Sequence, residues 1–281
     1  MRVLSSWLLA LCLTGGCVFA KTQATPAKLA SGGPGDLLIA PGRLVFEGRT
    51  RTAALNLTNI GLQKATYRIT MTRMEMSENG SFKELPTNPE TDKQLFSLFS
   101  YSPHEVVLEP QESQAVRFLV KKPADLPPGE YRVHLVFRAI PPTPDPTTPP
   151  RNDGTISITL TPIYGLSIPL ILRHGDTSAS ASIAQVSLDQ GQKNLLFDLN
   201  RLGNQSVYGN LEATLLPPKG SAKPLATMNG VAVYANMPTR HVSLPLPADT
   251  PLPKGSRIQI TFSAPVDAKG TKLAPTEFLI P

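Results

Sequence analysis

Short runs that alternate between apolar and polar residues follow one another along the chain, and they constrain its fold more than any other feature. Residues 55–58 read Leu-Asn-Leu-Thr, and the same two-residue period recurs in residues 67–72, 116–120 and 131–137. Successive side chains of a strand point to opposite faces, so this period indicates strands with one buried face. Because no long window has a 3.6-residue repeat, only residues 92–98 are predicted to form a helical turn. The chain is predicted to be all-β and to fold as antiparallel sandwiches.

Turn-forming residues punctuate these runs. Asn79-Gly80 lies between two strand-like runs and predicts a β-hairpin. A second series of alternating runs occupies residues 195–262, and Asn229-Gly230 is expected to form a turn within it. Between the two series, the small polar residues 174–182 (HGDTSASAS) predict a hinge between two domains.

The first twenty residues, MRVLSSWLLALCLTGGCVFA, have the layout of a secretory signal peptide. Arg2 is followed by an apolar run and by a small-residue cleavage site that ends at Ala20. The apolar run is too short to cross a bilayer. A lipoprotein signal processed at Cys17 is the alternative, although Thr14 stands where such signals usually have Leu. We favour cleavage after Ala20, and both versions export the protein from the cytoplasm.

Beyond this signal peptide (residues 1–20) the chain has no cysteine, because Cys12 and Cys17 both lie within it. The exported protein is therefore expected to be held together by its core, without disulfides or thiolate-bound metal. Residues 21–35 are small, polar and rich in glycine, which predicts a disordered lead-in. The remainder is expected to form an N-terminal domain at 36–175 and a C-terminal domain at 176–281.

The composition argues against several classes of function. The net charge is +6, but Lys and Arg are scattered, without the basic run and interleaved aromatics that nucleic-acid binding favours. No HExxH, GxSxG, P-loop or GxGxxG motif is present, and the four histidines have no metal-ligand spacing. The only Trp lies in the signal peptide. We therefore expect no enzymatic activity, no cofactor, no metal and no small-molecule substrate.

One histidine belongs to an alternating run. His134 lies between Val133 and Leu135, and its parity is opposite to that of the apolar residues of its strand. It is expected to face outward or into a groove, as a polar surface residue.

The stretch at 154–173, GTISITLTPIYGLSIPLILR, continues one alternating register over about three times the usual strand length. Ile156, Ile158 and Leu160 point to one face of this strand. The preceding segment, 141–153, contains six prolines and is expected to be a stiff exposed loop. Prolines within the strand argue against full pairing, so the sequence predicts a strand that is open to a partner on one side. The alternative is that its apolar residues belong to an ordinary core.

Several stretches, taken together in their order and spacing, resemble the PapD-like periplasmic chaperones of pilus assembly. The resemblance covers residues 36–281 and implies two immunoglobulin-like β-sandwiches set at an angle. The stretches are LLIAPGRLVFEGRTRTAALNLTN (37–59), YSPHEVVLEPQESQAVRFLV (101–120), PPGEYRVHLVFRAIP (127–141), GLSIPLILRHG (165–175), FDLNRLGNQSVYGNLEATL (197–215) and ATMNGVAVYANMPTRHVSL (226–244).

The resemblance implies a function in the periplasm. A chaperone of this kind binds, caps and delivers pilus or fimbrial subunits to an outer-membrane usher. The subunit lacks its last strand, and the chaperone fills the open groove with its own long strand. By this resemblance, Ile156, Ile158 and Leu160 are the groove-filling side chains.

The resemblance also implies where the carboxylate at the subunit's C-terminus is held. Arg43, in APGRLVF, matches the first arginine of the family's cleft, and its planar guanidinium suits a carboxylate. The second base of the family, a Lys, is replaced here by Pro169. Arg132 and His134, on the preceding strand, are candidates to complete the anchor.

Two further residues match family positions that form a buried charged contact between the domains. These are Glu130 and Arg173, each of which would need the other to offset the cost of burying a charge. The competing functions are a secreted structural pilus subunit or surface adhesin, and a β-sandwich enzyme or carbohydrate-binding module. Residues 21–35 do not fit the free alternating strand of a subunit, and the chain has only 6% aromatic residues.

Overall fold

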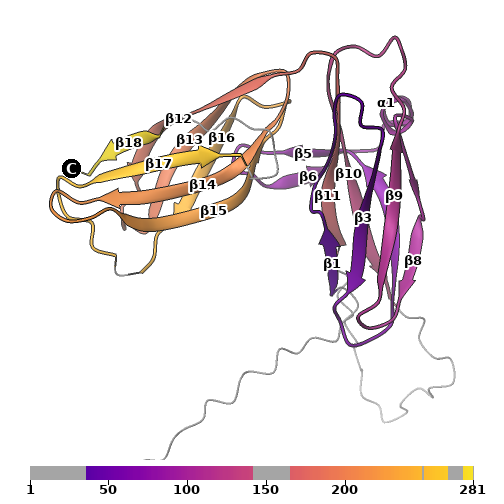
Figure 1. Ribbon diagram of the computed structural model, residues 1–281, viewed down its shortest axis with the longest axis horizontal. Helices are drawn as coiled ribbons and strands as arrows, with labels where there is room; N and C mark the ends of the chain where they lie inside the picture. Colours follow the sequence, from indigo (N-terminus) through magenta and orange to yellow (C-terminus); the bar gives the residue numbers. More distant parts are fainter. Residues whose placement is uncertain (1–35, 142–164, 249, 265–274, 281) are drawn as a thin grey trace, which may run out of the picture. The chain divides into compact units, whose positions relative to one another are not determined.

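The computed structural model describes residues 36–141, 165–248, 250–264 and 275–280 (Figure 1). Within them the chain forms two β-sandwiches and a separate two-stranded sheet, with α1 as the only helix. The prediction of an all-β chain with two β-sandwiches is confirmed. Residues 156, 158 and 160 of the predicted donor strand lie outside the described residues.

The first sandwich packs a four-stranded sheet on a five-stranded one. In spatial order, the four-stranded sheet contains β1 (Leu37–Ala40), β3 (Thr52–Asn59), β9 (Ser113–Val120) and β7 (Phe99–Ser102). The five-stranded sheet contains β2 (Leu44–Phe46), β11 (Gly165–His174), β10 (Gly129–Ile140), β4 (Ala65–Thr72) and β8 (Glu105–Leu108). Strands β2 and β11 pair in parallel, and the other neighbouring strands pair antiparallel.

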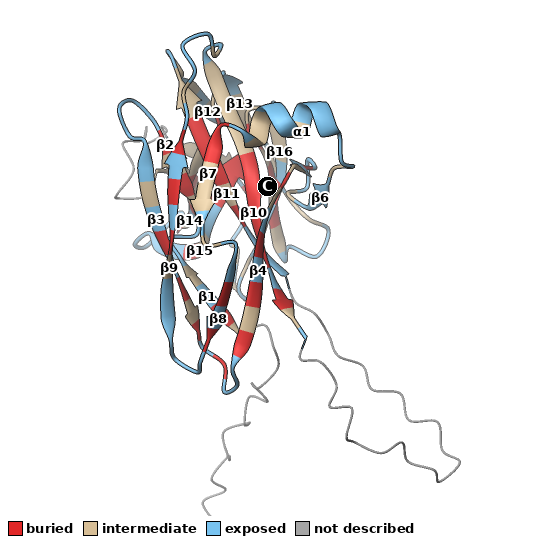
Figure 2. Ribbon diagram, turned by 90° about the vertical axis from the view of Figure 1, so that its right-hand side faces the viewer, coloured by how far each residue is buried: buried red, intermediate tan, exposed pale blue. Residues whose placement is uncertain are grey.

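The alternating runs form strands because one side of each can leave water. In β3, Leu55 and Leu57 are buried in the core between the sheets, whereas Asn56 is exposed. Burial of each Leu contributes about 1.5–3 kcal/mol relative to leaving it in water. The strand β10 differs, because the five consecutive residues from Val133 to Phe137 are all buried, so that both of its faces are covered (Figure 2).

The helix begins earlier than the sequence predicted. It spans Pro89–Phe96, and Asn88 caps its start by accepting a hydrogen bond from the amide of Thr91. Proline is well suited to the first helical position, where its missing N–H is not needed. No residue of α1 is buried, as its exposed and half-buried colours in Figure 2 show. Leu95 and Phe96 are partly buried against the core of the first sandwich, and the cap and the acidic first turn also stabilise the helix.

The second sandwich also packs two sheets. One contains β12 (Ala179–Leu188), β13 (Asn194–Gly203) and β16 (Thr239–Pro245), and the other contains β15 (Lys223–Val233), β14 (Val207–Leu216), β17 (Arg257–Ser263) and β18 (Thr276–Leu279). Two expectations from turn chemistry are wrong here. The predicted hinge is shorter, because its Ala and Ser residues from 179 onward alternate as the start of β12. Asn229-Gly230 makes no turn, and lies inside β15 where its register with β14 shifts.

Strand β11 is paired unequally on its two sides. It pairs with β10 from Gly165 to His174, but β2 pairs with it only at Leu170–Leu172. Among the described residues, the segment from Gly165 to Pro169 therefore has a strand on one side only. Pro169, which has no N–H to donate, lies in this half-paired segment, as expected for proline in a sheet.

The predicted hairpin is present and belongs to neither sandwich's sheets. It consists of β5 (Met74–Met76) and β6 (Phe82–Glu84), joined through a turn in which Gly80 has a φ of 85°. Although the hairpin follows β4 in the chain, Met76 is buried in the core of the second sandwich. Ile171 of β11 joins the same core. The hairpin and β11 thus connect the first sandwich to the second by apolar contacts.

Candidate functional site

Arg43 lies at the end of the turn that leads into β2. Its Nη2 donates a hydrogen bond of 3.0 Å to Oγ of Ser206, and its guanidinium lies 4.6 Å from the ring centre of Tyr208. Its Nη1 is buried and has no hydrogen-bond partner in the described structure. Burial lowers the pKa of Arg43, although an arginine remains charged at neutral pH.

Arg132 on β10 has a similar environment. Its guanidinium lies 3.6 Å from the ring centre of Tyr234, and its Nη2 donates to the carbonyl of Met74 at 3.0 Å. Its Nη1, like that of Arg43, is buried without a hydrogen-bond partner in the described part of the chain. Burial is the main cause that lowers the pKa of Arg132, and the charge of Arg43 lowers it further. The two arginines therefore belong to one electrostatic cluster, and each is placed over an aromatic ring of the second sandwich.

His134 contradicts the expectation of a surface histidine, because only 2% of it is exposed. Its ring makes edge contacts with Phe82 of the hairpin and with Tyr234, at centroid distances of 5.2 and 6.2 Å. Burial, followed by the charges of Arg132 and Arg43, lowers the pKa of His134 to about 3. The ring is neutral at pH 7 and adds no positive charge to the site.

The strand register explains how His134 comes to stand here. It lies opposite Pro169, and Arg132 lies opposite Ile171. Arg132 and His134 are therefore on the same face of β10, with Val133 between them in the sequence. That face is covered by the hairpin, and this tertiary contact is absent from the alternation of the sequence.

Glu130 and Arg173 lie opposite each other on β10 and β11 and form an ion pair, with 3.2 Å between Arg173 Nε and Glu130 Oε2. The side chain of Glu130 is 1% exposed. The same Oε2 accepts hydrogen bonds from the amide and the hydroxyl of Ser206, at 2.9 and 2.8 Å. Sequence reasoning expected the two charged residues together and missed Ser206, their contact in the second sandwich. Ser206 lies in an ordinary polar turn that gives no local signal of this contact.

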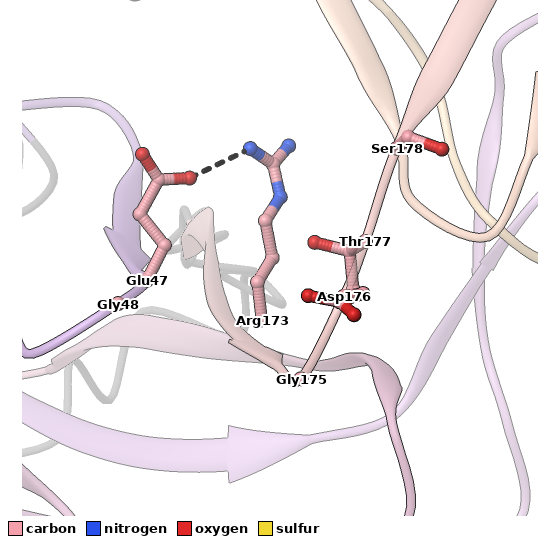
Figure 3. Close-up of a pocket in the computed structure, with 7 residues that line it drawn as sticks. All are labelled: Glu47, Gly48, Arg173, Gly175, Asp176, Thr177 and Ser178. Atoms are coloured by element: carbon pink, nitrogen blue, oxygen red, sulfur yellow. Dashed lines mark hydrogen bonds and ion pairs between the residues drawn. The ribbon is translucent and has the colours of Figure 1, made fainter.

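Arg173 is a third arginine of this cluster, and it differs from the other two because it forms ion pairs with two carboxylates. Besides Glu130, it contacts Oε2 of Glu47 at 3.1 Å, an ion pair that Figure 3 shows as a dashed line. Neither Arg43 nor Arg132 has an ion pair with any described residue. The cluster therefore contains two buried or half-buried guanidinium groups that lack a carboxylate.

A cavity of about 260 Å³ lies beside Arg173, which is one of its lining residues (Figure 3). It is lined by Glu47, Gly48, Arg173, Gly175, Asp176, Thr177 and Ser178. Because its one arginine is already paired with Glu47 and Glu130, this cavity offers an anion no free cation. Arg43 and Arg132, by contrast, each keep a buried Nη1 that has no hydrogen-bond partner among the described residues.

The described residues meet the requirements of neither a metal site nor a membrane-spanning helix. No group of three or more His, Cys, Asp or Glu side chains is arranged there to hold a metal ion. No helix in this part of the chain is long and apolar enough to cross a membrane.

Comparisons with known proteins gave matches among solved structures alone. No protein-family model matches the sequence, and no curated protein matches it. A structure of the SafA pilin in complex with the SafB chaperone of Salmonella enterica is similar at 15% identity and a TM-score of 0.44, covering 88% of this chain and 97% of that chain. The CsuC–CsuE chaperone–tip adhesion subunit complex of archaic Csu pili from Acinetobacter baumannii has 15% identity and a TM-score of 0.43, covering 86% and 97%. The E. coli chaperone DraB has 14% identity and a TM-score of 0.43, covering 87% and 96%.

Proposed function

We propose that this protein is a periplasmic chaperone that binds, caps and delivers pilus or fimbrial subunits for chaperone–usher assembly. It acts by binding and not by catalysis. One observation carries the proposal: the Nη1 atoms of Arg43 and Arg132 are buried and lack a hydrogen-bond partner among the described residues. A buried charged donor without an acceptor is costly, so such a pair favours an anion that arrives from outside.

The subunit's C-terminal carboxylate is the anion that we assign to this site. Two guanidinium groups can give it charge-assisted hydrogen bonds, which are among the strongest in proteins. Arg132 takes the role of the second base, which Pro169 cannot fill. His134 is neutral and supports the site by packing against Tyr234.

The donor strand extends the half-paired β11 towards its N-terminus. Ile156, Ile158 and Leu160 have the same parity as Leu166 and Ile168 of β11, of which Leu166 is exposed. In this proposal the subunit pairs with the free side of the strand and buries the three apolar side chains. The usher is the second partner, and Glu130 with Arg173 maintains the contact between the domains.

The proposed location rests on the signal peptide. Residues 1–20 are removed on export, residues 21–35 precede the first domain, and the domains occupy 36–175 and 176–281. Mass spectrometry of protein from the periplasm should find Lys21 at the N-terminus. A lipid-modified N-terminus at Cys17 would contradict this and would place the protein on a membrane.

Subunit capture tests the function itself. The tagged protein is purified from the periplasm of its own host, and a photo-crosslinking residue at position 157 or 158 identifies what the strand touches. We expect a pilus subunit to crosslink from position 158, whose side chain enters the groove, more than from position 157. Replacement of Ile156, Ile158 and Leu160 together by Ser should abolish capture and leave the thermal unfolding of the free protein unchanged. Unfolding of this variant would instead assign the three residues to the protein's own core.

A further inference from the structure

Ser206 occupies the turn between β13 and β14 and is 2% exposed. Each of its polar groups contacts a charged side chain of the first sandwich. Its amide and its hydroxyl reach Glu130 Oε2, its hydroxyl also reaches Arg43 Nη2, and its carbonyl accepts from Arg173 Nη2 at 3.2 Å. A single serine of the second sandwich thus joins three charged residues of the first.

The direction of these hydrogen bonds follows from the chemistry of the partners. A guanidinium group can only donate, and an ionised carboxylate can only accept. The hydroxyl proton of Ser206 must therefore point to Glu130, at 2.8 Å, while its oxygen accepts from Arg43 at 3.0 Å. Hydrogen bonds arranged in such a chain strengthen one another in a buried environment.

We propose that Ser206 is a positioning residue that holds Arg43 in its carboxylate-binding orientation and links that orientation to the buried Glu130–Arg173 pair. This inference rests on the proposed function of Arg43. With Nη2 held by Ser206, the buried Nη1 of Arg43 has no hydrogen-bond partner among the described residues, and it is the group that we assign to the incoming carboxylate. Without the hydroxyl, the guanidinium loses its one side-chain acceptor among the described residues and keeps its contact with the ring of Tyr208.

The coupling between carboxylate binding at Arg43 and the contact between the sandwiches works in both directions. If an ordered contact between the sandwiches improves carboxylate binding, then carboxylate binding must strengthen that contact by the same factor. Ser206 is the group through which this coupling passes, because it contacts both Arg43 and Glu130. A subunit bound at Arg43 would therefore also stabilise the contact between the two sandwiches.

The test uses the full-length exported protein with its arginine side chains labelled with ¹⁵N. The probe is sodium acetate, acetamide is the uncharged control of the same shape, and ionic strength is held constant with sodium chloride. Acetate should shift the Nε–H resonance of Arg43 in the unmodified protein, and acetamide should not. Ser206→Ala should weaken acetate binding at Arg43 about tenfold, the effect of losing one hydrogen bond to a charged group.

Two variants separate positioning from general stability. Ser206→Thr keeps the hydroxyl and should retain most of the acetate binding. Ser113→Ala is the control variant. It removes a serine hydroxyl that is hydrogen-bonded to Thr58 and does not belong to the polar contact, so it should leave acetate binding unchanged. If Ser206→Ala lowers thermal stability but leaves the acetate affinity of Arg43 unchanged, Ser206 has a merely structural role and the inference is wrong.

A measurement without acetate makes the result independent of the proposed function. Ser206→Ala should speed rotation of the Arg43 guanidinium about its Nε–Cζ bond, while that of Arg132 stays as in the unmodified protein. Unchanged rotation at Arg43 would overturn the positioning role. If this rotation responds but acetate never binds, the positioning role stands and the carboxylate anchor of the proposed function is what fails.

Discussion

The two sandwiches are connected by two contacts of opposite chemistry. The polar contact consists of Glu130, Arg173, Ser206 and Arg43, which are joined by charge-assisted hydrogen bonds. The hairpin contact is largely apolar, with Met76 in the second core and Phe82 against Tyr234. The stabilisation from apolar burial is non-directional and needs no specific charged partner. A buried charge is stabilising only while its partner is present. The hairpin contact is therefore suited to holding the sandwiches together, and the polar contact to responding to a ligand.

The hairpin contact also has a polar margin. Glu78 in the turn accepts a backbone hydrogen bond from His241 of β16 at 2.7 Å. Gly80 lies so close to the guanidinium of Arg240 that a side chain there would overlap it, and its φ of 85° also favours glycine. Because the guanidinium of Arg240 is the end of a flexible side chain that could move, the positive φ is the main reason for glycine at this position.

The largest effect is expected from breaking the polar contact. Glu130→Ala leaves Arg173 without its buried partner and removes the acceptor of two Ser206 hydrogen bonds. Removal of one member of a buried ion pair costs about 3–5 kcal/mol of the free energy of unfolding. Urea denaturation measures this loss. As a control, Glu109→Gln breaks an exposed pair with Lys64 and should change stability very little.

The next effect should come from the hairpin contact. Met76→Ala deletes a side chain that is 3% exposed in the second core and should cost about 2–5 kcal/mol of the free energy of unfolding. It should leave acetate binding at Arg43 unchanged, since Met76 does not touch the polar contact. Leu202→Ala, at a residue that is 77% exposed, is the matched control. Loss of acetate binding in Met76→Ala would show that the hairpin contact and the polar contact are not independent.

A pH-dependent effect, absent at neutral pH, is expected at His134, which packs against the hairpin. In the folded protein its pKa is lowered to about 3, mainly by burial, so it stays neutral where the unfolded chain takes up a proton. Stability should therefore fall by about 1.4 kcal/mol per pH unit as the pH drops below about 6 towards 3. His134→Gln should remove this component when urea denaturation is compared at pH 7 and pH 4.5. Equal pH dependence in the two proteins would mean that His134 is not buried as a neutral ring.

The smallest effect should come from the margin of the hairpin. The imidazole of His241 lies 2.6 Å from Asp198 and 3.2 Å from Glu78, and its pKa is raised, first by the hydrogen bond to Asp198. A raised pKa gives stability that is fully present below about pH 6.5 and is lost as the pH rises through the pKa of the folded protein. Because these groups are exposed, the change in melting temperature between pH 6 and pH 9 should be slight. His241→Gln should remove this change in melting temperature. A larger change in the variant than in the unmodified protein would contradict a stabilising role for protonated His241.

Sequence patterns predict those parts of the fold where one face of a strand is in water. The strand β3 alternates because its outer side chains are exposed, and its boundaries follow from that. The strand β10 misled the interpretation of His134, because the hairpin covers its outer face and no local pattern records a tertiary cover. The prediction of a turn at Asn229-Gly230 failed for a related reason. A dipeptide that suits a turn also suits an irregularity within a paired strand.

The candidate site divides in the same way. Arg43, Glu130 and Arg173 could be named from the resemblance of their own stretches to a family, and Arg132 from its place on the strand that precedes Pro169. Ser206, Tyr208 and Tyr234 could not, because they contact Arg43 or Arg132 from strands and turns that are far away in sequence, 163 residues in the case of Ser206 and Arg43. Each is unremarkable in its local pattern, and its importance depends on how the second sandwich meets the first.

The most direct test of the account is whether the two unpaired arginines hold a carboxylate. The subunit identified by crosslinking supplies a synthetic C-terminal peptide, made once with a free carboxylate and once as an amide, and calorimetry measures both. The unmodified protein should bind the free acid at least about thirtyfold more tightly than the amide, because charged partners typically contribute about 2–5 kcal/mol. In Arg43→Gln/Arg132→Gln the two peptides should bind equally. Equal affinity for the acid and the amide in the unmodified protein would contradict the account.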